Sequence, residues 1–181
     1  NRINLIQDKV DSIDYSSKKL MLVEGGDFSY DRLILAVGSK SNKFGWPGQD
    51  LEAVQGLYNF EDLQGMETYA PSTKRAVIVG GGLIGIEMAE MFRSRNIPVT
   101  LLVREPSFWN NVLPSQESAL INRHIREYDI DLRLTSELKE IKGDSNGRVK
   151  SIVTADGEEI SCEFVGLTTG VSPNIDFLKN T

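Results

Sequence analysis

Residues 74–92 read KRAVIVGGGLIGIEMAEMF, and this stretch decides the fold. A short β-branched run, Val77–Val79, comes first and is typical of a buried strand. Gly80, Gly82 and Gly85 then follow at the G-x-G-x-x-G spacing. Beyond them, apolar residues recur at three- and four-residue steps, which indicates a helix. These residues are Leu83, Ile84, Met88, Met91 and Phe92. The stretch therefore predicts a strand, a tight turn and a helix.

Each glycine of this turn has its own physical role in a dinucleotide site. Gly80 permits the turn, Gly82 lets a pyrophosphate approach the backbone, and Gly85 lets the helix pack closely on the strand. The helix N-terminus adds unpaired N–H groups and the positive end of the helix dipole. We therefore expect a dinucleotide to bind here, and the alternative is a glycine-rich turn that binds nothing. The expected binding residues are Gly80, Gly81, Gly82, Leu83, Ile84 and Gly85.

The sequence after the helix continues an alternation of strands and helices. Pro98–Val103 is a second strand, which completes a β-α-β unit. Ser115 is expected to be the N-cap of a helix over residues 116–128. Ile130–Leu134 predicts a third parallel strand. The apolar stripe expected on the helix consists of Leu120, Ile121, Ile125 and Tyr128.

Three short strands are expected next, separated by Asp/Asn/Gly turns at residues 144–147 and 156–157. They form a β-meander inserted before the last core strand, residues 165–169. The expected ranges of the short strands are 138–141, 149–154 and 159–164.

The N-terminal part, residues 1–38, predicts a small β-meander. Its first run combines residues 3–6 and 10–13, and Leu20–Val23 is its second strand. Glu24–Asp27 is a hairpin turn signal.

Two further elements are expected between this meander and the glycine-rich stretch. Arg32–Val37 is continuously apolar after its first residue and predicts a third, buried strand. Residues 57–64 indicate a short helix with Asn59 as its N-cap and acidic residues just inside it.

Composition places the chain among ordinary globular proteins. It has 181 residues, of which 40% are hydrophobic and 25% charged, enough for one domain and part of another. A net charge of −6 argues against nucleic-acid binding, which needs a basic face. One cysteine allows no internal disulfide, and the longest uncharged apolar run, residues 76–86, is too short to span a bilayer. Because the chain starts with Asn1 in the middle of a pattern, we expect a piece of a larger protein.

Two more motifs flank the glycine-rich stretch. Residues 30–39 read YDRLILAVGS, and residues 164–174 read FVGLTTGVSPN. In this order around residues 80–87, the motifs resemble the two-dinucleotide flavoprotein reductases of the pyridine nucleotide-disulfide oxidoreductase superfamily. That family writes them as Y-D-x-L-I-x-A-T-G-S, G-G-G-x-I-G-x-E and G-x-x-P-N. The resemblance covers nearly the whole chain, and Val37 departs from it where the family usually has Thr.

The resemblance implies an α/β fold: a Rossmann-like three-layer NAD(P)-binding domain with an inserted β-meander, preceded by a β-meander of the neighbouring FAD domain. We expect four segments. They are the distal part of the FAD domain (1–48), a connecting segment (49–73), the NAD(P)-binding domain (74–170) and a return toward the FAD domain (171–181).

The implied function is that of a fragment of a flavin-dependent NAD(P)H oxidoreductase. In the parent, NAD(P)H would transfer a hydride to FAD. FAD is expected only in the full-length parent, with Ala36 and Gly38 on the FAD side. The alternative, from another class, is a non-catalytic dinucleotide-binding or regulatory module. A flavin-free Rossmann dehydrogenase would leave the flanking motifs unexplained.

Glu87 and Gly170 complete the implied site. In the resembled family the glutamate matching Glu87 lies near the nicotinamide and the flavin and orients the ring, so no catalytic residue is expected in this fragment. A carboxylate that only interacts with the helix dipole is the alternative. Gly170 closes the site, because its small size lets backbone approach the dinucleotide.

The end of the second strand suggests which dinucleotide binds. NAD-preferring members usually carry an acid where this chain has Val103. Arg104 follows and can grip a 2′-phosphate with two parallel hydrogen bonds, so the sequence favours NADP over NAD. Glu105 could instead pair with Arg104 or hold the adenosine ribose itself.

The remaining candidate residues carry no expected chemistry. His124 is the only histidine and Cys162 the only cysteine, so no metal constellation is expected. Expected partners are the missing FAD and interface domains of the parent and an electron acceptor protein, in a cytoplasmic enzyme without a membrane span. The final acceptor, the oligomeric state and any redox-active cysteine before Asn1 lie outside this sequence.

Overall fold

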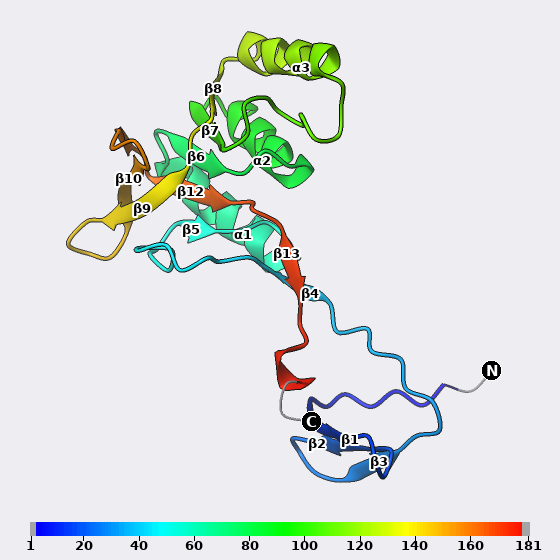
Figure 1. The fold of residues 1–181 in the computed structure, drawn as a ribbon. Helices are drawn as coiled ribbons and strands as arrows, with labels where there is room; N and C mark the ends of the chain where they lie inside the picture. Colours follow the sequence, from blue (N-terminus) through cyan, green and yellow to red (C-terminus); the bar gives the residue numbers. More distant parts are fainter. Residues whose placement is uncertain (1–2, 179–181) are drawn as a thin grey trace. The chain divides into compact units, whose positions relative to one another are not determined.

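The computed structural model describes residues 3–178, which form two compact units (Figure 1). The first unit comprises the chain up to Lys40 and from Ser172 onward, and the second comprises Ser41–Val171. The unit boundaries fall in β4 (Ser39–Ser41) and β13 (Val171–Pro173), which pair as a two-stranded sheet. The outer ends of the expected terminal segments, residues 1–2 and 179–181, lie outside the described residues.

A parallel five-stranded sheet is the core of the second unit. Its strand order is β5-β12-β6-β7-β8, and each neighbouring pair runs parallel (Figure 1). Because β6 and β7 are central strands, all of their residues are buried. The sheet confirms the expected Rossmann-like α/β fold. Its strands are β5 (Val54–Gln55), β6 (Ala76–Val79), β7 (Val99–Val103), β8 (Ile130–Leu134) and β12 (Phe164–Leu167).

The helices are α1 (Phe60–Tyr69), α2 (Leu83–Arg93) and α3 (Ser115–Glu127), with short 3-10 turns η1 (Ala70–Ser72) and η2 (Asp176–Leu178). Helix α2 follows β6 directly, as expected, and packs on the sheet through buried Met88, Ala89 and Phe92. A Cβ added to Gly166 of β12 would lie 2.2 Å from the Met88 sulfur, so the helix sits directly against this strand.

The cap of α1 is confirmed. The Asn59 side chain accepts a hydrogen bond from the Asp62 amide at 2.8 Å, and the Asp62 carboxylate accepts one from the Asn59 amide at 3.3 Å. This reciprocal pair is a capping box, which satisfies two amides that the helix leaves unpaired.

The cap and the apolar stripe expected for α3 are wrong in part. Ser115 is the first helical residue, and Pro114 with its extended backbone (ψ 153°) precedes the helix. Leu120 and Tyr128 are 53% and 63% exposed, although they were expected to face the core. Two polar residues, Ser118 and Asn122, occupy part of the buried face instead. The Asn122 side chain is needed there for its hydrogen bonds, which are described below. The buried residues of α3 are Ser118, Asn122 and Ile125.

The inserted meander is confirmed. It is an antiparallel sheet of order β11-β10-β9, placed in the chain between β8 and β12. Gly147 (φ +81°) and Gly157 (φ +94°) adopt the left-handed backbone that their turns require. The strands are β9 (Leu138–Gly143), β10 (Val149–Thr154) and β11 (Glu159–Ser161).

The first unit contains the expected N-terminal meander, with two errors. The first run forms a strand only from Val10, because no strand pairs with residues 3–6 in the described part of the chain, and Ile3 and Leu5 are 90% and 91% exposed. The antiparallel sheet of this unit has the order β1-β2-β3, and a turn at Glu24–Gly26 joins the last two strands. The buried strand expected at Arg32–Val37 is not present in the described part of the chain, and Ile34 is 90% exposed. A run of apolar residues forms a buried strand only beside strands that pair with its backbone, and no strand within residues 3–178 pairs with this run. The strands are β1 (Val10–Asp14), β2 (Lys19–Leu22) and β3 (Asp27–Ser29).

Thr168, just beyond β12, closes the turn between β6 and α2. Its amide and its hydroxyl both donate to the carbonyl oxygen of Val79, at 2.9 and 3.0 Å. A Cβ on Gly85 would lie 2.3 Å from the Gly80 carbonyl oxygen and 2.8 Å from the Thr168 hydroxyl. A Cβ on Gly82 would meet no atom within 4 Å. Gly85 is therefore required by packing, whereas Gly82 faces open space.

We expect Gly85→Ala to destabilise the chain, because backbone in the turn would have to move. The expected loss is about 1–3 kcal/mol of unfolding free energy, as for other overpacked sites. Gly82→Ala is the matched control and should cost less than ~1 kcal/mol, since only helix N-cap preference changes. Urea unfolding followed by circular dichroism compares the two variants. Equal losses would contradict the packing role assigned to Gly85.

Candidate functional site

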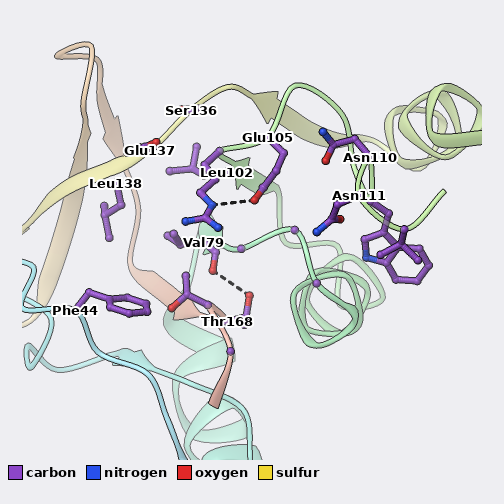
Figure 2. Close-up of a pocket in the computed structure, with 18 of the residues that line it drawn as sticks. Phe44, Val79, Leu102, Glu105, Asn110, Asn111, Ser136, Glu137, Leu138 and Thr168 are labelled. Carbon is purple, nitrogen blue, oxygen red and sulfur yellow. Dashed lines mark hydrogen bonds and ion pairs between the residues drawn. The ribbon is translucent and has the colours of Figure 1, made fainter. Parts of the chain in front are cut away.

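The carboxyl end of the parallel sheet opens into a cleft of about 570 Å³ (Figure 2). This size lies within the range of small-molecule sites, and the end of the sheet where the strands finish is where α/β folds bind ligands. The glycine turn, the ends of β6 and β7, and the segment after β12 form its inner walls. The residues that line the cleft are Phe44, Trp46, Val79, Gly80, Gly81, Gly82, Leu102, Arg104, Glu105, Trp109, Asn110, Asn111, Val112, Ser136, Glu137, Leu138, Thr168, Thr169 and Gly170.

The glycine turn presents the N-terminus of α2 to the cleft. Gly82 is the N-cap residue, in extended backbone, and no side chain caps the helix there. The first amides of a helix have no intrahelical acceptor, so they remain able to bind an anion. Gly81 is close to the wall, since its Cβ would lie 2.8 Å from a Val103 methyl group. The turn therefore combines close packing on one side with open space at Gly82.

The end of β7 supplies a charged wall. Val103 itself is buried (1% exposed) and does not line the cleft. The Arg104 Nε donates to the Glu105 carboxylate at 2.8 Å, and both residues line the cleft, where Figure 2 labels Glu105. The hydrogen bond with Glu105 and its negative charge raise the pKa of Arg104. The Arg104 guanidinium, which the sequence suggested as a ligand for a 2′-phosphate, is thus already paired with Glu105.

A loop that the sequence left unassigned forms the outer wall. It carries Trp109, Asn110, Asn111 and Val112. The buried side chain of Asn122 in α3 holds this loop, because its Oδ1 accepts from the Phe108 amide at 2.9 Å. The Asn122 Nδ2 also donates to the Ser107 hydroxyl at 2.7 Å. A polar residue within the helical pattern was the only signal of this contact in the sequence.

The segment after β12 is hydrogen-bonded to residues 42–46, the linker that follows β4. Gly170, with left-handed backbone (φ +92°), accepts a hydrogen bond from the Asn42 amide at 3.0 Å through its carbonyl oxygen. The Asn42 side chain donates to the Thr169 carbonyl at 3.3 Å. These bonds fix the start of the linker, whose Phe44 and Trp46 also line the cleft with rings 5.3 Å apart. The sequence identified Gly170 but gave no sign of the two aromatic residues.

Glu87 lies elsewhere in the second unit. It is exposed on α2 and lines a separate depression of about 450 Å³ together with Ile84. Leu83, 60% exposed, begins the same helix. The other residues of this depression are Leu57, Tyr58, Asn59, Phe60, Leu63 and Met91. Of the fingerprint residues, the three glycines of residues 80–82 therefore line the cleft, while Ile84 and Glu87 line the depression.

In the first unit, the two remaining motifs meet. The Asn174 amide donates to the Gly38 carbonyl at 3.0 Å, and its side chain donates to the carbonyls of Val37 and Ser39, both at 3.1 Å. Ala36 is exposed just before this contact. The asparagine of the downstream motif thus fixes the A-x-G turn of the upstream motif, although 137 residues separate Val37 from Asn174.

The only histidine and the only cysteine of the sequence lie away from the cleft lining. His124 is exposed on α3. Cys162 is fully buried, and burial raises the pKa of its thiol to about 12, so it is not a reactive thiolate at neutral pH. Within residues 3–178, no group of three or more His, Cys, Asp or Glu could hold a metal ion. None of the helices in the same range is long and apolar enough to cross a membrane.

Comparisons with known proteins agree with this architecture. The ferredoxin–NAD(+) reductase component of the biphenyl dioxygenase system of Paraburkholderia xenovorans (strain LB400) is 26% identical over 165 residues. That alignment covers 91% of this chain and 40% of the relative. The rubredoxin–NAD(+) reductase of Ectopseudomonas oleovorans is 27% identical over 165 residues, with 91% and 43% covered. The chain thus spans about two fifths of the length of these relatives.

A solved structure and a family model complete the comparison. A ferredoxin reductase from Rhodopseudomonas palustris superposes with a TM-score of 0.90 at 27% identity, over 98% of this chain and 44% of that one. The family model for pyridine nucleotide-disulphide oxidoreductases matches residues 1–181. Together with the parallel sheet and its glycine turn, this match identifies the chain as a member of the pyridine nucleotide-disulphide oxidoreductase family.

Proposed function

We propose that this chain is the NAD(P)H-binding part of an FAD-dependent oxidoreductase, and that the cleft holds the dinucleotide. The observation that carries the proposal is the open space at Gly82. The N-terminus of α2 ends there without a side-chain cap, and a Cβ on Gly82 would meet nothing within 4 Å. Open space beside helix amides that lack an intrahelical acceptor suits a pyrophosphate, which needs both close backbone approach and positive potential.

The residues of the cleft fit the other parts of a dinucleotide. Residues 80–82 would hold the pyrophosphate, and the charged wall at Arg104 and Glu105 would face the adenosine ribose. Gly170 and Thr168 would face the opposite half, because they lie beyond β12 on the other side of the glycine turn. When bound, NAD(P)H supplies the hydride, and the contribution of this chain is to bind and orient it.

Glu87 and the FAD-side residues are proposed from the family resemblance. We place Glu87 as an orienting residue for the nicotinamide, since it lies exposed near the N-terminal end of α2. We place Ala36 and Gly38 beside the flavin in the parent protein. Hydrogen bonds from Asn174 to the carbonyls of Gly38 and Val37 fix the backbone of this turn, which supports its proposed position beside the flavin. The chain contains one G-x-G-x-x-G fingerprint, so a second dinucleotide, FAD, would require residues of the parent.

The electron acceptor is proposed from the relatives' names. These are ferredoxin and rubredoxin reductases, so we propose a small electron-carrier protein as the acceptor of the parent enzyme. A nicotinamide dinucleotide as reductant agrees with the cytoplasmic location expected from the sequence.

For the dinucleotide itself we propose NADH rather than the NADPH favoured by the sequence. The sequence preference rested on Arg104 and on the absence of an acid at Val103. In the structure, Glu105 accepts from that guanidinium and lines the cleft with it, so the carboxylate reduces its attraction for a 2′-phosphate. A carboxylate that lines the ribose end can also accept hydrogen bonds from ribose hydroxyls. The two relatives described above are NAD(+) reductases by name, which supports the same choice.

Gly82→Val tests the site. The valine side chain would fill the space proposed for the pyrophosphate, so NADH affinity should fall at least ~100-fold, a change of about 2.7 kcal/mol. Isothermal calorimetry measures the affinity, and circular dichroism verifies that the variant is folded. The purified wild-type chain should carry no stoichiometric FAD. Unchanged NADH affinity in folded Gly82→Val would exclude the turn from the site, and a flavin-loaded chain would contradict the assignment of FAD to the parent.

Glu105→Gln tests the ribose contact. Losing a charge-assisted hydrogen bond to the ribose should weaken NADH roughly tenfold, at the lower end of the ~1.5–3 kcal/mol typical of such bonds. NADPH binding should not weaken, because the same change removes a negative charge. The control is Glu90→Gln, an exposed acid on α2 outside the cleft. If wild type binds NADPH more tightly than NADH, Arg104 determines the choice and the NADH proposal is wrong.

A further inference from the structure

A third charged residue, Glu137, lies on the same wall of the cleft and has no role in the proposed function so far. It belongs to the loop between β8 and β9, more than thirty residues along the chain from Arg104. Both Glu137 and Ser136 line the cleft, and Figure 2 shows them across from Glu105 at its upper rim. Within the described residues, the Glu137 carboxylate has no hydrogen-bond or ion-pair partner in the protein.

Backbone hydrogen bonds fix the Glu137 loop to the end of β7. The Thr135 amide donates to the Glu105 carbonyl at 3.0 Å, and the Ser136 amide donates to the Val103 carbonyl at 3.1 Å. The Glu137 carbonyl in turn accepts from the Ala155 amide at 2.8 Å. The backbone of Glu137 is therefore held on both sides, close to the end of β7, and its exposed side chain extends from this fixed backbone.

The charges on this wall do not balance. Glu105 is paired with Arg104, and Glu137 adds a second carboxylate to the single guanidinium. The negative charge of Glu137 reaches Arg104, since it contributes to raising the pKa of that residue. The wall thus carries one net negative charge where the adenosine ribose is expected. A ribose with free hydroxyls tolerates this charge, whereas a 2′-phosphate would be repelled.

We propose that Glu137 is a specificity-determining residue that rejects the 2′-phosphate of NADPH. This inference rests on the proposed dinucleotide site and differs from the role of Glu105. Glu105 would bind the ribose of NADH, whereas Glu137 would act only against the phosphorylated ribose. Discrimination of this kind works by placing a repulsive group against the wrong ligand.

The test compares affinities of the folded chain for NADH and NADPH in wild type, Glu137→Gln and Glu140→Gln. Glu140 lies on β9 outside the cleft and is the matched control, because its substitution removes the same charge only three residues along the chain from Glu137. Glu137→Gln should raise NADPH affinity on the order of tenfold, the size expected for repulsion between a carboxylate and a phosphate across partly screened solvent. Its NADH affinity should stay within about twofold of wild type, and Glu140→Gln should change neither.

A second readout isolates the 2′-phosphate from the nicotinamide. ADP-ribose and its 2′-phosphorylated form should show the same pattern, and the wild-type penalty against the phosphorylated ligand should shrink as salt rises. If Glu137→Gln binds both dinucleotides with the wild-type ratio, or if Glu140→Gln shifts the ratio equally, Glu137 does not determine specificity. In that case the dinucleotide site itself still stands. If wild type binds neither dinucleotide, both the site and the role of Glu137 are wrong.

Discussion

Two hydrogen bonds from Thr168 to the Val79 carbonyl oxygen are the contact on which the cleft depends. They join the ends of β6 and β12 where the glycine turn begins. The Thr168 hydroxyl also occupies the space that a Cβ on Gly85 would need. The first turn of α2 can therefore start directly against the strand ends, and its amides are presented to the cleft rather than to bulk solvent. A ligand site at the helix N-terminus follows from this packing.

Much of the second unit could be predicted from sequence, because its elements are specified locally. The β-branched run at β6, the glycine spacing and the period of α2 each indicate one element, and the capping box at Asn59 is also local. The error at Arg32–Val37 has the opposite cause. An apolar run specifies a tendency to be buried, but burial also needs partner strands, which the pattern of the run does not reveal. Leu120 and Tyr128 in α3 were misplaced for a related reason, since the loop contacts of Asn122 determine which face of that helix is buried.

The candidate site was predicted in part. The glycines of residues 80–82, Gly170 and the pair Arg104–Glu105 line the cleft as expected. The sequence missed residues that reach the cleft through long-range contacts, namely Thr168, Phe44, the loop held by Asn122, and Glu137. Thr168 lies in the downstream stretch of residues 164–174 but outside its G-x-x-P-N pattern, and the others belong to no motif. The net charge at the ribose end depends on such contacts. Backbone hydrogen bonds hold the β8–β9 loop against the end of β7, and this brings Glu137 near Arg104. The preference for NADP that the sequence indicates at Val103 and Arg104 leaves out the charge of Glu137, and the proposed dinucleotide therefore changes to NADH.

The central claim is that the cleft binds the pyrophosphate of a nicotinamide dinucleotide at the N-terminus of α2. Amide chemical shifts of the ¹⁵N-labelled chain, titrated with ADP-ribose, test this claim most directly. The account predicts saturable shifts that are largest for the amides of Gly82, Leu83 and Ile84, with smaller shifts at Glu105 and the loop of Trp109. Unchanged amides at residues 82–84, with shifts confined to the separate depression around Tyr58 and Met91, would contradict it.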